Sequence, residues 1–322
     1  MSFPWGARFA FTILDDTDVA TVENVAPVYR LLDELGLRAT KTVWPLAGRE
    51  PGSPFAGSQT LEDAEYRDFV IDLRRRGFEI TWHGAAMDSS ERKRTLEGLA
   101  RFRAVLGEAP RIHANHATNR ENLYWGAGRV DDRIVRAVAR RASGLPEDHY
   151  QGHAEGSAYW WGDACLRHID YARNLTFDAV NLMRINPSMP YRDPRRPLAR
   201  WWFSAADAED RAEFVRLLES GRQARLEAEG GVCIVATHFA KGFVRGGEVD
   251  PAARRVLEEL ARRRGWFPTV GELLDRLRDH GAGGVLPAAE WRRMQRAWVL
   301  GLARRSWRRR RRRGGVGLLG GE

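Results

Sequence analysis

The sequence contains little cysteine, little lysine and no long hydrophobic run. The two cysteines, Cys165 and Cys233, are too few for a disulfide framework or a four-cysteine zinc site. No stretch of about 18 apolar residues is present, and the mean hydropathy of -0.49 argues against an integral membrane protein. The N-terminal residues MSFPWGARFAF lack the apolar core and cleavage site of a signal peptide, so we expect a cytoplasmic location.

The composition is otherwise that of a folded protein. The chain has 322 residues, of which 43% are hydrophobic and 10% aromatic, enough to bury a sizeable core. The net charge of +9 lies entirely after residue 286, where eleven arginines accompany two glutamates. Because residues 1–286 are neutral overall, we expect no specific binding of nucleic acid by the folded body.

Apolar strands alternate with amphipathic helices along most of the chain. This alternation predicts an α/β fold in which parallel strands build a sheet or barrel. The predicted strands are Arg8–Leu14, Arg38–Trp44, Phe78–Trp82, Arg111–Ala114 and Gly231–Thr237, with a last short strand beginning at Phe267. The predicted helices are Val19–Leu35, Leu61–Arg76, Ser89–Leu106, Asp131–Ala142, Ala206–Ala228, Pro251–Arg264 and Val270–His280. The remainder of Asn115–Ser204 is expected to be a long irregular insertion.

Polar side chains gather where these predicted strands end. They are Asp15, Asp16, Asp18, Lys41, Trp44, His83, His113, Asn115, His116, His238 and Lys241. The carboxyl ends of parallel strands meet at one edge of a sheet, where the chemistry of such folds takes place. Aspartate and histidine are common ligands of divalent metals, so the set predicts a metal site. Each residue alone has a structural alternative: Asp18 can cap a helix, His113 can be buried in its strand, and His238 can stabilise a turn.

The order of these motifs resembles the polysaccharide deacetylases, the NodB-homology group of carbohydrate esterases. FTILDDTD at Phe11–Asp18 is similar to the first family signature, GFEITWH at Gly77–His83 to the second, and IVATH at Ile234–His238 to the last. The resemblance covers about Arg8–Leu277. It implies a distorted (β/α) barrel and a divalent metal, with zinc as the expected ion, that serves to remove an acetyl or other acyl group from a sugar.

The resemblance also implies roles for individual residues. By position in the signatures, Asp15 is the general base, Asp16 and His83 are metal ligands, and His238 is the general acid. The family's second signature has a further histidine where this chain has Met87, and a thioether is a poor zinc ligand.

A third ligand is therefore expected from the His113–His116 segment, and we prefer His116 because it lies beyond the strand. The arginine-proline-tyrosine signature of the family is absent from this region, and Thr17 replaces the glycine that follows the aspartate pair. These departures indicate a remote branch.

Polar and aromatic residues near the strand ends are candidates for contacts with a sugar. They are Lys41, Trp44, Asn115, Asn119, Tyr124, Trp125 and Lys241. Aromatic rings stack on the apolar faces of sugars, although the same rings are also typical of core packing.

The basic C-terminal segment completes the expected organisation, with a barrel domain over residues 1–280 and a flexible tail over 281–322. Ala288–Arg305 has the pattern of an amphipathic basic helix. The tail can contact an anionic membrane surface at the inner membrane face, bind nucleic acid without sequence specificity, or be a disordered extension.

Three functions fit these observations. The first is a metal-dependent deacetylase acting on a carbohydrate or polysaccharide precursor, and the second is an inactive, carbohydrate-binding relative. The third is a partner of nucleic acid or membrane that acts through its tail. The sequence does not indicate an oligomeric state.

Overall fold

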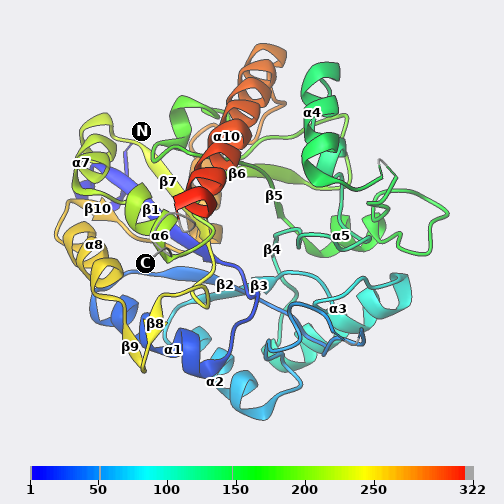
Figure 1. Ribbon diagram of the computed structural model, residues 1–322, viewed down its shortest axis with the longest axis horizontal. Helices are drawn as coiled ribbons and strands as arrows, with labels where there is room; N and C mark the ends of the chain where they lie inside the picture. The colour runs from blue at the N-terminus through cyan, green and yellow to red at the C-terminus, as the bar shows by residue number, and fades with distance from the viewer. Residues whose placement is uncertain (1, 51, 147, 316–322) are drawn as a thin grey trace, which may run out of the picture.

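The centre of the molecule is a closed barrel of parallel strands (Figure 1). The computed structural model describes residues 2–50, 52–146 and 148–315. Strands β1 to β7 follow one another round the barrel, and pairing of β7 with β1 closes it. They are β1 (Phe9–Asp15), β2 (Ala39–Val43), β3 (Glu79–Trp82), β4 (Ile112–His113), β5 (Tyr171–Phe177), β6 (Trp201–Asp207) and β7 (Val232–Thr237). The predicted distorted (β/α) barrel is therefore confirmed.

The distortion is concentrated at β4 and β1. Strand β4 has only two residues, and a single residue pair, Trp82 with His113, joins it to β3. The first residues of β1 pair with the short β10 (Gly265–Trp266), and its last three pair with β2. Every residue of β1 and β7 is buried, because the barrel interior covers one face of these strands and helices cover the other.

Helices surround the barrel (Figure 1). Those that follow barrel strands or close the fold are α1 (Val22–Glu34), α2 (Ala64–Arg75), α3 (Arg92–Leu106), α6 (Arg211–Leu217), α7 (Ser220–Glu229), α8 (Pro251–Ala261) and α9 (Val270–Asp279). Thr21 and Thr269 form capping boxes at the starts of α1 and α9, while Gly107 ends α3 in the left-handed conformation. The strand–helix units predicted over residues 8–106 are present.

The middle of the chain is more regular than predicted. It contains α4 (Arg133–Ser143), α5 (Gly162–His168) and the 3-10 turns η2 (Gly126–Arg129) and η3 (Leu182–Arg184). A further 3-10 turn, η1 (Pro4–Gly6), lies near the N-terminus. It also supplies β5 and most of β6, two of the seven barrel strands. The prediction of one helix over Ala206–Ala228 is wrong, because β6 continues to Asp207 and two separate helices follow. A small hairpin of β8 (Val244–Arg245) and β9 (Glu248–Val249) lies between β7 and α8.

The basic segment after the barrel includes helix α10 (Ala288–Gly315), which begins where the amphipathic helix was predicted. Its apolar side chains Trp291, Met294 and Trp298 are buried against the barrel. The tryptophans on which membrane contact was partly based therefore face the protein, and that contact stays a prediction. Residues 316–322 of the predicted tail lie outside the described residues.

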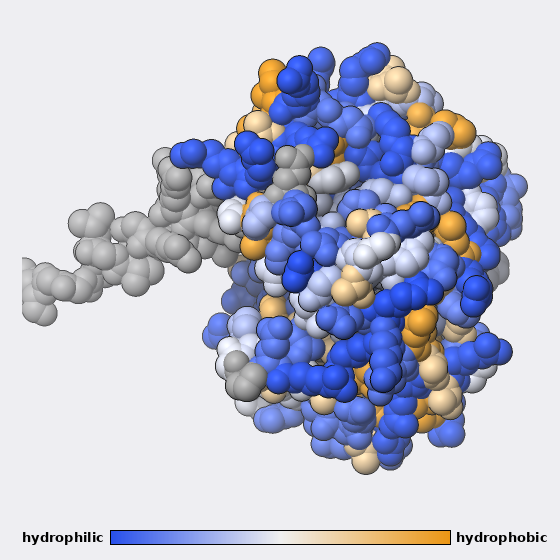
Figure 2. All heavy atoms as spheres, turned by 90° about the vertical axis from the view of Figure 1, so that its right-hand side faces the viewer, coloured by the Kyte–Doolittle hydropathy of each residue, from blue (hydrophilic) through white to orange (hydrophobic). Residues whose placement is uncertain are grey.

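Figure 2 shows that the face to the right of Figure 1 is mainly hydrophilic, with hydrophobic side chains in small separate groups. Within residues 2–50, 52–146 and 148–315, none of the helices has the length and apolar character needed to cross a membrane.

Candidate metal centre

A cavity of about 250 Å³ lies at the carboxyl ends of the barrel strands. Its lining comes from the ends of β1 and β3 to β7, and from helix α10 on one side. The lining residues include Asp16, Asp18, His83, Asn115, His116, Trp125, Arg129, Arg173, Asp207, Glu209, His238, Lys241, Trp298 and Leu302. The cavity is therefore at the edge of the barrel where the sequence predicts a site.

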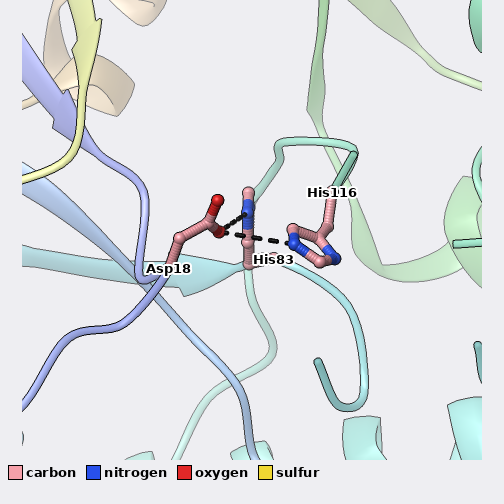
Figure 3. Close-up of side chains that lie close together, drawn as sticks. All are labelled: Asp18, His83 and His116. Carbon is pink, nitrogen blue, oxygen red and sulfur yellow. Dashed lines mark hydrogen bonds and ion pairs between the residues drawn. The ribbon is translucent and has the colours of Figure 1, made fainter. Parts of the chain in front are cut away.

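Asp18, His83 and His116 lie together on one side of this cavity (Figure 3). They come from the loops after β1, β3 and β4, and one ligand atom of each lies within 4.8 Å of the others. The Oδ1 atom of Asp18 is 3.2 Å from Nε2 of His83 and 3.5 Å from Nε2 of His116. One carboxylate and two imidazoles form a donor set that zinc and related divalent ions accept.

The backbone directly after Asp18 is strained. Val19 has a φ of 52°, which is uncommon for a β-branched residue. Its N–H donates to Oγ of Ser58 at 2.9 Å, and its carbonyl oxygen accepts from Nδ2 of Asn24 at 2.9 Å. These contacts hold the sharp turn between β1 and α1 against its conformational cost.

The hydrogen bonds around His116 determine which of its nitrogens carries the proton. Nδ2 of Asn119 lies 3.2 Å from the carbonyl oxygen of Ala86, 3.0 Å from that of Asp88 and 3.0 Å from Oε1 of Glu121, so it must be the amide's donor end. The Oδ1 atom of Asn119 is then the acceptor that meets Nδ1 of His116 at 3.0 Å. Nδ1 therefore carries the proton, and the lone pair of Nε2 points toward Asp18. This is the arrangement of a metal-ligating histidine held by an outer hydrogen bond.

The unsatisfied atoms of the cluster fit a cation. Nε2 of His116 and Nδ1 of His83 are buried, and neither has a hydrogen-bond partner among the described residues. Burial lowers the pKa of His116 to about 4, so its ring is neutral at pH 7. Burial opposes ionisation of Asp18, but hydrogen bonds with His238 and His83 hold the pKa of this carboxyl well below its usual range. An ionised carboxylate beside the neutral ring of His116 is the state in which these two groups bind a divalent metal.

Asp16 was predicted as a ligand, but its carboxylate is bound by an arginine. The guanidinium of Arg173 donates to both oxygens, at 3.1 and 2.7 Å. Burial opposes ionisation of Asp16, but the charge of Arg173 holds the pKa of this carboxyl below its ordinary value. The side chain still lines the cavity, with Oδ1 3.8 Å from Nδ1 of His83. Asp18 thus takes the position beside the two histidines that Asp16 was expected to hold.

Asp15, predicted as the general base, lies behind the barrel wall. Its carboxylate accepts hydrogen bonds from Nζ of Lys41 at 2.8 Å, from the Tyr29 hydroxyl at 2.9 Å and from the backbone N–H of Phe239 at 2.8 Å. Asp15 and Lys41 are paired in the β1–β2 register, and both are fully buried away from the cavity. This placement does not fit a role for Asp15 as a base in the cavity or for Lys41 as a contact of substrate.

His238 and Lys241, from the loop after β7, complete the cavity as predicted. Nδ1 of His238 donates to the carbonyl oxygen of Glu209 at 2.8 Å, and Nε2 lies 3.2 Å from Oδ2 of Asp18 and 4.0 Å from Oδ2 of Asp16. Burial opposes protonation of His238, but the contact with Asp18 raises its pKa above the ordinary value. Nζ of Lys241 is 3.5 Å from the same oxygen of Asp18. Both ring nitrogens of His238 therefore face oxygen acceptors, an arrangement that favours the protonated imidazole.

Of the seven predicted substrate contacts, three line the cavity: Asn115, Trp125 and Lys241. Trp44 is buried beneath the ligands, with its ring 5.1 Å from that of His116, and Asn119 holds that histidine. Tyr124 stacks against the ring of His153 at 4.3 Å. These side chains shape the site from behind, like Lys41, and do not face the cavity.

The cavity lining also includes residues that were not predicted as part of the site, among them Arg129, Arg173, Asp207, Glu209 and Trp298. Arg173 lies in β5, a strand whose sequence YARNLTF carries arginine and asparagine at buried positions. A strand with charged interior residues does not show the apolar pattern by which the other strands were recognised. Trp298 was noted only as part of an amphipathic helix, and nothing in its sequence indicates that the helix returns to the barrel.

The comparisons with known proteins agree with this architecture. No family model and no curated protein matches the sequence. A crystal structure of a candidate polysaccharide deacetylase from Mycobacterium smegmatis is similar with a TM-score of 0.53 at 13% identity, over 89% of this chain and 96% of that one. PuuE allantoinase and a candidate polysaccharide deacetylase from Pseudomonas aeruginosa PAO1 give TM-scores of 0.49 and 0.48, each at 13% identity over 87% of this chain and 93% of theirs. The first of these similarities confirms the predicted resemblance to polysaccharide deacetylases at the level of the fold.

Proposed function

We propose that this protein is a metal-dependent hydrolase that removes an acetyl or related acyl group from nitrogen on a carbohydrate or polysaccharide precursor. The observation that carries the proposal is the buried set of Asp18, His83 and His116 beside a second carboxylate, Asp16, in one cavity of a deacetylase-type barrel. A metal site, a neighbouring carboxylate as general base and an imidazole as general acid are the catalytic groups that amide hydrolysis requires.

Each side chain has a role that its position allows. Asp18, His83 and His116 would hold the ion, for which zinc is our first choice, and the ion would supply polarisation of the acyl carbonyl. Asp16, kept ionised and oriented by Arg173, accepts the proton of the attacking water. His238, fixed through its Nδ1 by a backbone carbonyl, donates a proton to the departing nitrogen from Nε2.

The substrate is oriented by the remaining lining residues. The indole of Trp125 and the ammonium of Lys241 line the cavity, where they are placed to contact a sugar. Asn115 also lines it, but its amide is engaged by His113 and Leu123. A substrate made inside the cell and presented at the inner membrane face is in keeping with the expected cytoplasmic location, and both belong to the proposal.

Metal content and acetate release test this function together. The purified chain is loaded with zinc, its metal is measured per chain, and acetate release is followed on a panel of N-acetylated monosaccharides and oligosaccharides. We expect about one zinc per chain and turnover of at least one sugar. Asp18→Ala should lose the zinc, whereas Asp16→Asn should keep it and lose turnover by at least a hundredfold.

The inactive carbohydrate-binding alternative predicts a different result. Zinc bound at full occupancy, with no acetate from any sugar in the panel but with measurable sugar binding, would support that alternative. Retention of zinc by Asp18→Ala and loss of zinc by Asp16→Asn would contradict the ligand assignment.

A further inference from the structure

Helix α10 forms one wall of the candidate active-site cavity. Figure 1 shows this helix lying across one side of the barrel opening. The side chains of Trp298 and Leu302 line the same cavity as the metal cluster. Trp298 is buried and Leu302 is half-buried at the rim. A segment that lies far beyond Lys241, the last residue of the predicted site, therefore lines the same cavity.

Buried polar contacts fix this wall in position. The carboxylate of Glu290 accepts hydrogen bonds from the backbone N–H and the hydroxyl of Ser188, at 3.0 and 2.7 Å. Oε1 of Gln295 accepts from the backbone N–H groups of Asp131 and Asp132, at 2.7 and 2.8 Å. Both α10 side chains are buried. Such contacts are directional, and breaking them would leave buried polar groups unpaired, so α10 is a fixed part of the barrel mouth.

An arginine connects the wall to the opposite rim. The guanidinium of Arg129 lies 3.8 Å from the ring centroid of Trp125 and 4.8 Å from that of Trp298. Stacking between two indoles holds the guanidinium in the gap between η2 and α10. The gap through which a long chain could leave the cavity on this side is thus filled by three large side chains.

We propose that α10 restricts the site to a small substrate, either a single N-acylated sugar or the end unit of a chain, and excludes the internal units of a polymer. This inference rests on the proposed function. An internal unit needs open space on both sides of the reacting group, whereas the cavity is about 250 Å³ and is closed on one side by α10. Sites for drug-sized ligands run from roughly 300 to 1,000 Å³, so this cavity fits one compact unit.

Substitutions at the rim of the full-length, zinc-loaded protein test the proposal. Leu302→Ala enlarges the cavity and Leu302→Trp fills it, while Leu300→Ala is the matched control because this leucine is 58% exposed on the same helix and does not line the cavity. The substrates are N-acetylglucosamine, its β-1,4-linked pentamer, and further N-acetylated monosaccharides with their oligomers. Acetate release gives kcat/KM, and mass spectrometry locates the deacetylated unit in each oligomer.

The parent protein should act on the monosaccharide and only on an end unit of the oligomer. Leu302→Ala should raise kcat/KM on internal units at least tenfold, Leu302→Trp should lower kcat/KM on the monosaccharide at least tenfold, and Leu300→Ala should change neither. Calorimetric binding of the same sugars to zinc-loaded Asp16→Asn gives a second readout, in which the monosaccharide should bind. Adding Leu302→Ala to this variant should increase its affinity for the pentamer.

The results separate the two proposals. Acetate from internal units of the pentamer by the parent protein, at a rate like that on the monosaccharide, overturns the role of α10 and leaves the proposed function intact. An unchanged kcat/KM on the monosaccharide in Leu302→Trp would also overturn the role of α10 and leave the proposed function intact. No acetate from any sugar in either size class overturns the proposed function, and the inference about α10 with it.

Discussion

Replacement of Asn119 tests whether an outer hydrogen bond sets the state of the metal site. Asn119 is not among the residues that line the cavity, but its Oδ1 atom is the acceptor for Nδ1 of His116, which does line it. Asn119→Ala removes that acceptor and leaves a buried imidazole N–H unpaired, which costs about 1–3 kcal/mol. It also frees the ring to rotate and to move its proton to Nε2, where a proton excludes the metal.

The size of the effect follows from this geometry. Loss of an outer partner of a ligating histidine typically weakens metal binding 10- to 100-fold, which corresponds to about 1.4–2.7 kcal/mol. We therefore expect the zinc dissociation constant of Asn119→Ala to rise by a factor in this range. Competition with a chromophoric chelator at pH 7.5 measures that constant, and urea unfolding of the metal-free protein measures the accompanying loss of stability.

Asn122→Ala is the matched control. Asn122 is buried in the same loop and its amide also contacts His116, but it donates to the backbone carbonyl oxygen at 2.7 Å and does not touch the ring. Its removal should lower stability by less, because the Asn122 side chain makes one such contact and Asn119 makes four, and it should leave zinc affinity within about threefold of the parent. Unchanged zinc affinity in Asn119→Ala, or an equal loss of zinc affinity in Asn119→Ala and Asn122→Ala, would refute the reasoning.

Three further predictions concern groups outside the cavity. Asp15→Asn leaves the ammonium of Lys41 buried without its carboxylate, so urea unfolding should show a loss of about 3–5 kcal/mol while zinc per chain is unchanged; lost zinc with intact stability would contradict this. Burial lowers the pKa of His113 to about 3, so the unfolded state binds a proton at this residue first, and stability is lost as pH falls below about 6.5. Between pH 7 and 5 the metal-free parent should therefore lose about 2 kcal/mol more unfolding free energy than His113→Gln. Equal losses in the two proteins would exclude His113 as the cause. In Gly152→Ala the new Cβ would meet a backbone carbonyl oxygen at 1.8 Å, so stability should fall by about 3 kcal/mol, whereas Gly128→Ala, where no atom lies within 4 Å, should be nearly neutral in the same urea assay.

The part of the fold that could be predicted is the part built by repeated local pattern. Strands β1 and β7 are continuous apolar runs and α1 has its buried residues at helical spacing, so each element is recognisable by itself. Strand β5 is not, because Arg173 and Asn174 stand where the pattern requires apolar side chains. Both are buried by partners that are distant in sequence: Arg173 pairs with Asp16, and Asn174 donates to the hydroxyl of Tyr191. A local sequence pattern cannot predict that a polar side chain is buried when its partner is distant in the sequence.

The sequence predicted the location of the candidate site more accurately than the roles of its individual residues. The convergence of aspartates and histidines follows from strand direction, and His83, His116 and His238 all reach the cavity. The roles of the aspartates depend on where β1 ends and on which side each residue faces. Successive side chains of a strand point to opposite faces, so Asp15 and Asp16 cannot both face the cavity. The sequence motif did not fix that choice, since a one-residue shift exchanges the two faces.

Arg173 separates the roles of the two carboxylates that do face the cavity. Both oxygens of Asp16 are taken up by its guanidinium, which orients this carboxylate and makes it a poorer donor to a cation. The oxygens of Asp18 meet imidazole nitrogens instead, at 3.2 and 3.5 Å for the two candidate ligands. An ion at Asp18 Oδ1 would therefore meet two imidazoles that can bind the same ion, whereas an ion at Asp16 would have to displace a guanidinium. Because Arg173 lies 157 residues from Asp16 along the chain, this division between ligand and base is a property of the closed barrel and cannot be read from the aspartate motif alone.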